Sequence, residues 1–216
     1  MESYRVPTGS GEAELVVKGS RFIGTAGPAS DAEGALRFIE NVRQRYPDAT
    51  HHAWAYRLPG TPQEIIASSD DGEPGGTAGR PMLAVLAGSE LFEVVVVGTR
   101  YFGGVKLGTG GLVRAYGAAA RAALESAPMG IKGLHRIASL RADYALLGPL
   151  RYEIEQHGAE VIDIAYAEDV RLEVAVPEAA LAALAAALGD LSNGAIALEA
   201  QVVATRYLLC STELPR

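Results

Sequence analysis

The amino-acid sequence predicts an α+β protein of two domains. Its 216 residues exceed the usual length of a single domain, about 100–150 residues. Strand-like and helix-like segments are mixed along the whole chain, and prolines and glycines at 128–133 interrupt this pattern after an alanine-rich helix. We therefore expect an N-terminal domain over residues 1–130, a linker, and a C-terminal domain over residues 134–212.

The overall composition is that of a globular protein that folds unaided, with 49% hydrophobic and 21% charged residues. A formal net charge of -7 argues against coating nucleic acid with the whole surface, but a local basic patch remains possible. Residues 1–7 lack a signal-peptide pattern, and no apolar run approaches the ~20 residues that cross a membrane. With Cys210 as its single cysteine, the chain is expected in the reducing cytoplasm.

The first half of the N-terminal domain shows two hairpins with a helix between them. Strands are expected at 14–17 and 21–25, around the turn Lys18-Gly19-Ser20. Asp31 is placed to cap a helix that reaches about Tyr46, before Pro47 prevents its continuation. The second hairpin is predicted from strand-like segments at 50–58 and 63–68.

The second half of this domain alternates glycine-rich connections with buried elements. Residues 70–79 are too rich in glycine and acid for an element interior and are expected to form a loop. A short helix should follow over 80–87, and the nearly all-apolar run 91–97 predicts a central strand buried on both faces. Residues 103–111 then form a second glycine-rich connection, which leads into a helix over 112–126.

The C-terminal domain has six predicted elements with short connections. In chain order they are a strand at 134–144, a helix at 146–157, strands at 160–166 and 170–176, a helix at 178–188 and a strand at 195–208. This βαββαβ order is that of the ferredoxin-like fold.

The strongest candidate for a functional surface is the glycine-rich, locally basic segment from Arg100 to Tyr116. No Asp or Glu occurs between residues 98 and 121, although the chain as a whole is acidic. Glycines let backbone N–H groups approach a ligand, and a helix N-terminus adds partial positive charge, which suits phosphate. Aromatic residues beside the cations could stack on unpaired bases. The candidate nucleic-acid or phosphate-binding residues are Arg100, Tyr101, Phe102, Gly103, Gly104, Lys106, Gly108, Gly110, Gly111 and Arg114.

A structural explanation of the same segment is also open. The segment has neither the Gly-Lys-Ser/Thr ending of a P-loop nor the spacing of a dinucleotide fingerprint. Its glycines could simply let the buried strand turn tightly into the next helix.

The acidic loop is a possible support for this surface. Its carboxylates could bind a hard cation such as magnesium. Alternatively, they cap the following helix or pair with the basic segment. We assign no metal and no cofactor, and no catalytic residue, because neither a hydrolase triad nor a reactive-cysteine pattern is present. The supporting residues are Asp70, Asp71, Glu73 and Thr77.

Two neighbouring histidines lie on the predicted strand 50–58. Since successive side chains of a strand point to opposite faces, His51 and His52 should not bind one metal together. Trp54 and Tyr56 share the face of His52 and are expected to form an aromatic stripe in the core.

Four blocks of sequence, taken together, resemble the bacterial YigZ and eukaryotic IMPACT family. The blocks are 18–23, 51–56, 70–81 and 99–116, and they occur in the order of the family. The resemblance implies a first domain like domain IV of elongation factor G, with the left-handed βαβ crossover of a ribosomal protein, and a second domain like domain V. Because eukaryotic relatives regulate translation, it also implies RNA, the ribosome or a translation-regulatory protein as a partner.

Three classes of function follow from these observations. The first is a non-enzymatic regulator of translation that binds nucleic acid or the ribosome through the glycine-rich basic surface. The second is a nucleotide-binding, magnesium-dependent phosphotransferase or hydrolase that uses Asp70, Asp71 or Glu73. The third is a protein-binding adaptor, in which the open sheet of the second domain is the face on which a partner protein docks. A concave surface formed jointly by 70–81 and 100–116 would favour a ligand site over two structural turns.

Overall fold

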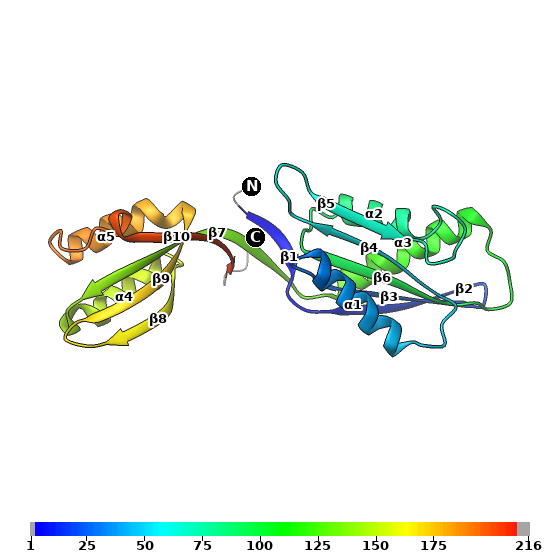
Figure 1. The fold of residues 1–216 in the computed structure, drawn as a ribbon, viewed down its shortest axis with the longest axis horizontal. Coiled ribbons are helices and arrows are strands. Elements are labelled where there is room, and N and C mark those ends of the chain that lie inside the picture. Colours follow the sequence, from blue (N-terminus) through cyan, green and yellow to red (C-terminus); the bar gives the residue numbers. More distant parts are fainter. Residues whose placement is uncertain (1–2, 211–216) are drawn as a thin grey trace. The chain divides into compact units, whose positions relative to one another are not determined.

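The computed structural model describes residues 3–210, so residues 1–2 and 211–212 of the predicted domains lie outside the described part (Figure 1). The chain forms two compact units, one over Tyr4–Gly130 and the other over Ser3 together with the chain from Ile131 onward. The first unit contains both candidate loops, and each unit is described separately below.

A five-stranded antiparallel sheet forms the middle of the first unit. Its strand order is β2-β3-β6-β4-β5, so β6 is central and pairs with β3 and β4 (Figure 1). The buried pattern of β6 agrees with the prediction of a central strand covered on both faces. The strands are β2 (Gly11–Val17), β3 (Ser20–Pro28), β4 (His51–Leu58), β5 (Ile65–Ser69) and β6 (Val94–Tyr101).

Helices cover both faces of this sheet. On one face α1 (Ala32–Arg45) packs against Val95 and Val97 of β6, together with the stacked rings of Trp54 and Tyr56. On the other face α2 (Gly79–Gly88) and α3 (Thr109–Ser126) pack against the remaining valines of β6 (Figure 1). The alternation of side chains along the strands thus builds two cores on one sheet.

The boundaries of α1 follow local sequence signals. The side chain of Asp31 accepts a hydrogen bond from the Gly34 amide at 2.7 Å, as expected of an N-cap residue. The helix ends at Arg45, directly before Tyr46 and Pro47. The predicted cap and stop are both confirmed.

The backbone of α3 lies close to β3 because both contact surfaces carry small residues. Alanines 115, 119, 120 and 123 of α3 belong to the core between helix and sheet. A Cβ atom at Gly24 of β3 would lie 2.2 Å from the carbonyl oxygen of Ala119. Only glycine fits at this crossing.

Two predicted boundaries in the candidate segment are wrong. The central strand was expected at 91–97, but β6 runs from Val94 to Tyr101, since Arg100 pairs with Phe22 on β3 and with His51 on β4. Partners on both sides extend the strand beyond its apolar run. In addition, α3 begins at Thr109 rather than at residue 112, so two of the glycines lie in its first turn.

The second unit has the predicted ferredoxin-like topology. Its βαββαβ strands adopt the order β10-β7-β9-β8, with antiparallel neighbours throughout. Strand β1 (Ser3–Pro7), which was not predicted and of which all but Ser3 belongs to the first unit, also pairs with β7. Helices α4 and α5 contribute leucines and isoleucine to one core with β7 and β9. The elements are β7 (Met129–Ala142), α4 (Leu147–Gln156), β8 (Glu160–Tyr166), β9 (Val170–Pro177), α5 (Leu181–Leu191) and β10 (Val202–Cys210).

Residues 128–133 are not the linker that their glycines suggested. Strand β7 already begins at Met129, and residues 131–138 pair with β10. Hydrogen bonds to a strand that lies some 70 positions later in the chain therefore override a local signal for a turn. The final strand β10 begins at Val202 rather than at residue 195, after a short 3-10 turn at Leu198–Gln201.

Candidate functional site

The acidic loop and the basic segment meet at one concave surface. Together they line a cavity of about 420 Å³, which we call the pocket. Its walls come from the start of β4, the 70–79 loop, the end of β6 and the N-terminus of α3. The lining residues are Thr50 and His51, Glu73 and Pro74, Arg100 and Phe102, Lys106 to Thr109, and Leu112.

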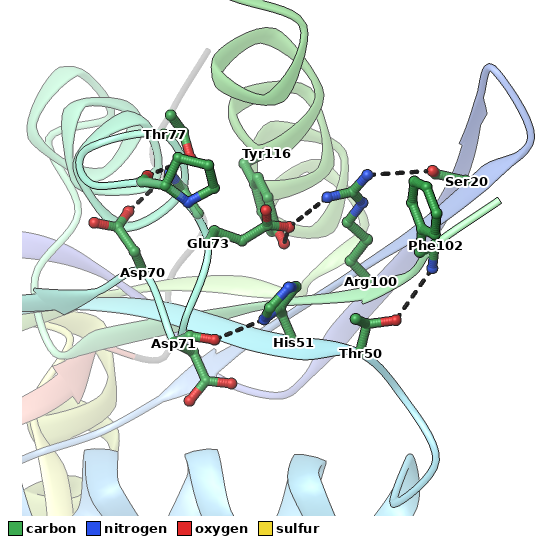
Figure 2. A network of polar contacts seen from close by, with 12 residues as sticks. Ser20, Thr50, His51, Asp70, Asp71, Glu73, Thr77, Arg100, Phe102 and Tyr116 are labelled. Carbon is green, nitrogen blue, oxygen red and sulfur yellow. Dashed lines mark hydrogen bonds and ion pairs between the residues drawn. The ribbon is translucent and has the colours of Figure 1, made fainter. Parts of the chain in front are cut away.

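A buried ion pair joins the two segments at the pocket. One Arg100 Nη donates to a Glu73 carboxylate oxygen at 2.7 Å, and the Tyr116 hydroxyl donates to the same oxygen, also at 2.7 Å (Figure 2). Arg100 and Glu73 are only 6% and 7% exposed, and Tyr116 is fully buried. Burial, together with the bond to Glu73, raises the pKa of Tyr116, so its hydroxyl remains a donor. Three elements thus converge on one carboxylate.

The guanidinium of Arg100 is also held by other groups. It lies 5.4 Å from the ring centres of both Phe22 and Phe102, at a distance typical of cation–π contacts, and its second Nη donates to Ser20 at 3.4 Å. Its Nε is buried and has no hydrogen-bond partner among the described residues. Arg100 was predicted as a phosphate-binding cation, but the structure places it in the pocket wall with its charge already paired.

Asp70 stabilises the start of α2. Its carboxylate accepts hydrogen bonds from the amides of Gly76, Ala78 and Gly79 at 2.7–2.9 Å. Burial alone would raise the pKa of Asp70, but these three donors together hold that pKa below its ordinary value. The side chain performs the capping role that was one of the two alternatives for this loop.

We expect replacement of Asp70 by alanine to lower the free energy of unfolding by about 1–2 kcal/mol near neutral pH, because it leaves the amides without an acceptor. The pKa of Asp70 is lower in the folded state than in the unfolded state. The carboxylate therefore stabilises the fold fully above its ordinary pKa of 3.8, and this stabilisation is lost as the pH falls through the lower pKa of the folded state. Denaturant unfolding at several pH values should therefore show that the difference in free energy of unfolding between wild type and variant becomes smaller below about pH 4. Asp163→Ala, an exposed carboxylate on β8, is the control. If Asp70→Ala lowers the free energy of unfolding equally at pH 3 and pH 7, the assignment of Asp70 as a charged cap is wrong.

The other polar residues of the acidic loop are also bound within the protein. One Asp71 oxygen accepts from Arg43 and the other from the amide of His52, each at 2.7 Å, while the ring of His51 contacts the Asp71 carbonyl (Figure 2). The Thr77 hydroxyl donates to the carbonyl of Pro74 at 2.6 Å. Asp70, Asp71 and Glu73 therefore point at three different sets of partners.

The rim of the pocket is more accessible than these groups. Lys106 is exposed and forms no ion pair within the described part of the chain, and Phe102 is 48% exposed. Gly104 and Gly108 have φ angles of 84° and 72°, which favour glycine, and the latter precedes the first turn of α3. Gly103 lies so close to Gly19 that a side chain there would collide with its backbone.

Several predicted residues are not part of the pocket lining, namely Tyr101, Gly103, Gly104, Gly110, Gly111 and Arg114 of the basic segment and Asp70, Asp71 and Thr77 of the acidic loop. Tyr101 follows Arg100 on a strand and so faces the other side of the sheet, where its hydroxyl donates to Asp48 at 2.8 Å. Arg114 is exposed on α3, where its guanidinium lies near Gly110 at the helix start.

Conversely, sequence reasoning did not assign Thr50 and His51 to the site. Alternation along β4 correctly separates the two histidines, but it does not show that a loop lies over His51.

Within residues 3–210, no helix combines the length and apolar character that a membrane crossing requires.

The fold and the pocket define a class of two-domain α+β protein. In its first unit, a sheet covered on both faces carries a cationic, aromatic-rimmed pocket, and its second unit is ferredoxin-like. Comparison with known proteins identifies the family. The Impact N-terminal domain matches residues 18–124, and a domain of unknown function, DUF1949, matches residues 140–195. The chain belongs to the IMPACT family.

Individual relatives extend over nearly the whole chain. The IMPACT family member YigZ of Escherichia coli (strain K12) is 40% identical over 92% of this chain and 98% of its own length. The IMPACT family member YvyE of Bacillus subtilis (strain 168) is 38% identical over 90% of this chain and 89% of its own. The crystal structure of a hypothetical protein is similar over 100% of both chains, with 36% identity and a TM-score of 0.62.

Proposed function

We propose that this chain is a non-enzymatic, translation-linked protein of the cytoplasm that binds nucleic acid or the ribosome through the rim of the pocket. The observation that carries the proposal is the convergence of the two loops on one cavity whose accessible charge is basic. Lys106 is exposed at this cavity without an ion-pair partner among residues 3–210, whereas the nearby carboxylates bond to the protein. The link with translation depends on the family resemblance, and the similarity to elongation-factor domains stays a prediction.

The local chemistry of the rim suits phosphate groups. Helix α3 has 18 residues, no side-chain hydrogen bond at its N-cap residue Gly108 and no acidic residue in its first turn. The amides at such a helix start attract anions. Lys106 precedes this helix and Arg114 lies on it, so both cations can contribute to the same electrostatic attraction.

A binding role fits the acidic loop better than a magnesium-dependent reaction does. Asp70 accepts three amide hydrogen bonds, Asp71 an arginine and an amide, and Glu73 an arginine and a tyrosine. To act as ligands of a metal they would have to give up contacts that shape the loop. Their arrangement instead supports a rigid wall for the pocket.

The double variant Lys106→Glu, Arg114→Glu tests the proposal. We expect its affinity for single-stranded RNA to fall at least about tenfold at low salt, and the slope of log affinity against log salt to decrease by about 1.4, because two phosphate contacts are lost. Binding is measured by fluorescence anisotropy between about 50 and 200 mM salt.

The control is Arg37→Glu, Arg151→Glu, which changes the net charge equally at exposed positions on α1 and α4 and leaves Lys106 and α3 unaltered. This control should bind RNA almost as wild type does. Equal weakening of both double variants would show a general charge effect and reject the rim as the binding surface. Unchanged affinity of the folded test variant would reject it as well.

A further inference from the structure

The pocket combines an apolar part with a cationic part. Phe102, Leu107 and Leu112 supply apolar surface, while Lys106 and the start of α3 supply positive charge. Surfaces that only neutralise a phosphate backbone need no recessed apolar wall. The apolar surface therefore indicates that the ligand carries a flat or apolar group next to its anionic group.

Phe102 is the residue most suited to contact such a flat group. About half of its side chain is exposed although the residue lies at a pocket, and its amide donates to the Thr50 hydroxyl at 3.2 Å. The ring also lies 5.4 Å from the guanidinium of Arg100 (Figure 2), which is held by Glu73. This contact fixes an exposed aromatic ring over a buried cation, and such rings form stacking platforms for bases.

Polar groups for orientation are present around this ring. The polar residues His51 and Thr109 line the cavity. Together with the uncapped start of α3 and with Lys106, they surround the apolar part with groups that can bind the edge of a base, a sugar hydroxyl or a phosphate.

The size of the pocket limits what can enter. Its volume of about 420 Å³ lies in the lower half of the range of roughly 300–1,000 Å³ found for small-molecule sites. A paired and stacked base inside a duplex presents no free face to such a recess, whereas an unpaired base does.

We infer that the pocket binds one unpaired nucleotide of a single strand, with its base stacked on Phe102 and its phosphate held by Lys106 and the N-terminus of α3. This inference builds on the proposed function and adds to it the form of the nucleic acid that is recognised. A nucleotide at a strand end, in a loop or in a bulge meets the requirement. A continuous duplex does not.

The variant Phe102→Ala tests the inference with a labelled ten-nucleotide RNA, the DNA of the same sequence, and the corresponding RNA duplex. Wild type should bind the single strands at least about tenfold more tightly than the duplex. Phe102→Ala should weaken single-strand binding by about tenfold, as expected for the loss of one stacked base. Its salt dependence and its duplex binding should be unchanged, because no phosphate contact is removed.

Further variants separate stacking from damage to the fold. Phe102→Trp should retain single-strand binding, and Tyr152→Ala, which removes an even more exposed aromatic ring on α4, should leave it unchanged. A 2-aminopurine placed in the oligonucleotide should be quenched on binding to wild type but not to Phe102→Ala. Comparison of the RNA and DNA strands shows whether the ribose hydroxyl contributes.

The possible outcomes distinguish this inference from the proposed function. Loss of RNA binding in Lys106→Glu, Arg114→Glu, with normal binding and quenching in Phe102→Ala, would overturn the inference and leave the proposed function standing. Equal affinity of wild type for single strand and duplex would do the same. Absence of any binding to RNA or DNA at low salt would overturn both.

Discussion

Replacement of Glu73 by glutamine is expected to lower the free energy of unfolding of the first unit by about 3–5 kcal/mol, the usual cost of leaving one member of a buried ion pair without its partner. The side chains of Glu73 and Arg100 are only 2% and 7% exposed. Glutamine has nearly the same volume, so the effect comes from charge and hydrogen bonding and not from a cavity. Denaturant unfolding of the full-length chain measures it.

A companion variant shows whether the loss arises from the unpaired guanidinium. If Glu73→Gln is destabilising because Arg100 remains charged and buried, then the double variant Glu73→Gln, Arg100→Met should lose much less stability than the sum of the two single variants. Arg37→Gln, which removes the partner of an exposed ion pair with Glu33, should change stability by less than about 1 kcal/mol. Additive effects of Glu73→Gln and Arg100→Met would show that the two side chains act independently.

Replacement of Gly24 by alanine should destabilise the first unit by about 3 kcal/mol, at the upper end of the usual cost of overpacking a core. The added Cβ would lie 2.2 Å from the carbonyl oxygen of Ala119 and 2.7 Å from its carbonyl carbon. Both are backbone atoms of α3, so no side-chain rotation can relieve the collision, and the helix must move away from the sheet.

Gly117→Ala in the same helix is the matched control. Apart from the adjacent backbone of its own helix, a Cβ atom there meets no atom within 4 Å, and alanine favours the helical conformation, so this variant should gain up to about 1 kcal/mol. Thermal or denaturant unfolding compares the two. If Gly24→Ala is as stable as wild type, then the close approach of α3 to β3 does not limit packing at this crossing.

Local patterns explain most of the secondary structure that could be predicted. The cap at Asp31 and the apolar run of β6 depend on neighbouring residues, and the order of elements in the second unit suffices for its topology. By contrast, β1 and the first residues of β7 become strands through pairing with distant segments. A single sequence does not reveal such partners, which is why residues 128–133 were taken for a linker.

The candidate site was predictable in its segments but not in the role of each residue. Both loops were identified from glycine content and charge, and they do meet. The burial of Arg100 was not predictable, because arginine is usually exposed and its carboxylate partner lies 27 positions earlier in the chain. The orientation of Tyr101 follows from strand alternation, but only once β6 is known to extend through that residue.

The carboxylate shared by Arg100 and Tyr116 has an evolutionary consequence. Substitutions within one hydrogen-bonded network have effects that are not additive. Loss of Glu73 would leave both Arg100 and Tyr116 without their acceptor, so selection would then act on both of these positions. We expect homologous chains to change these three positions together or to keep all three. A change at the exposed rim, such as the replacement of Lys106, should instead alter what is bound without unfolding the wall behind it.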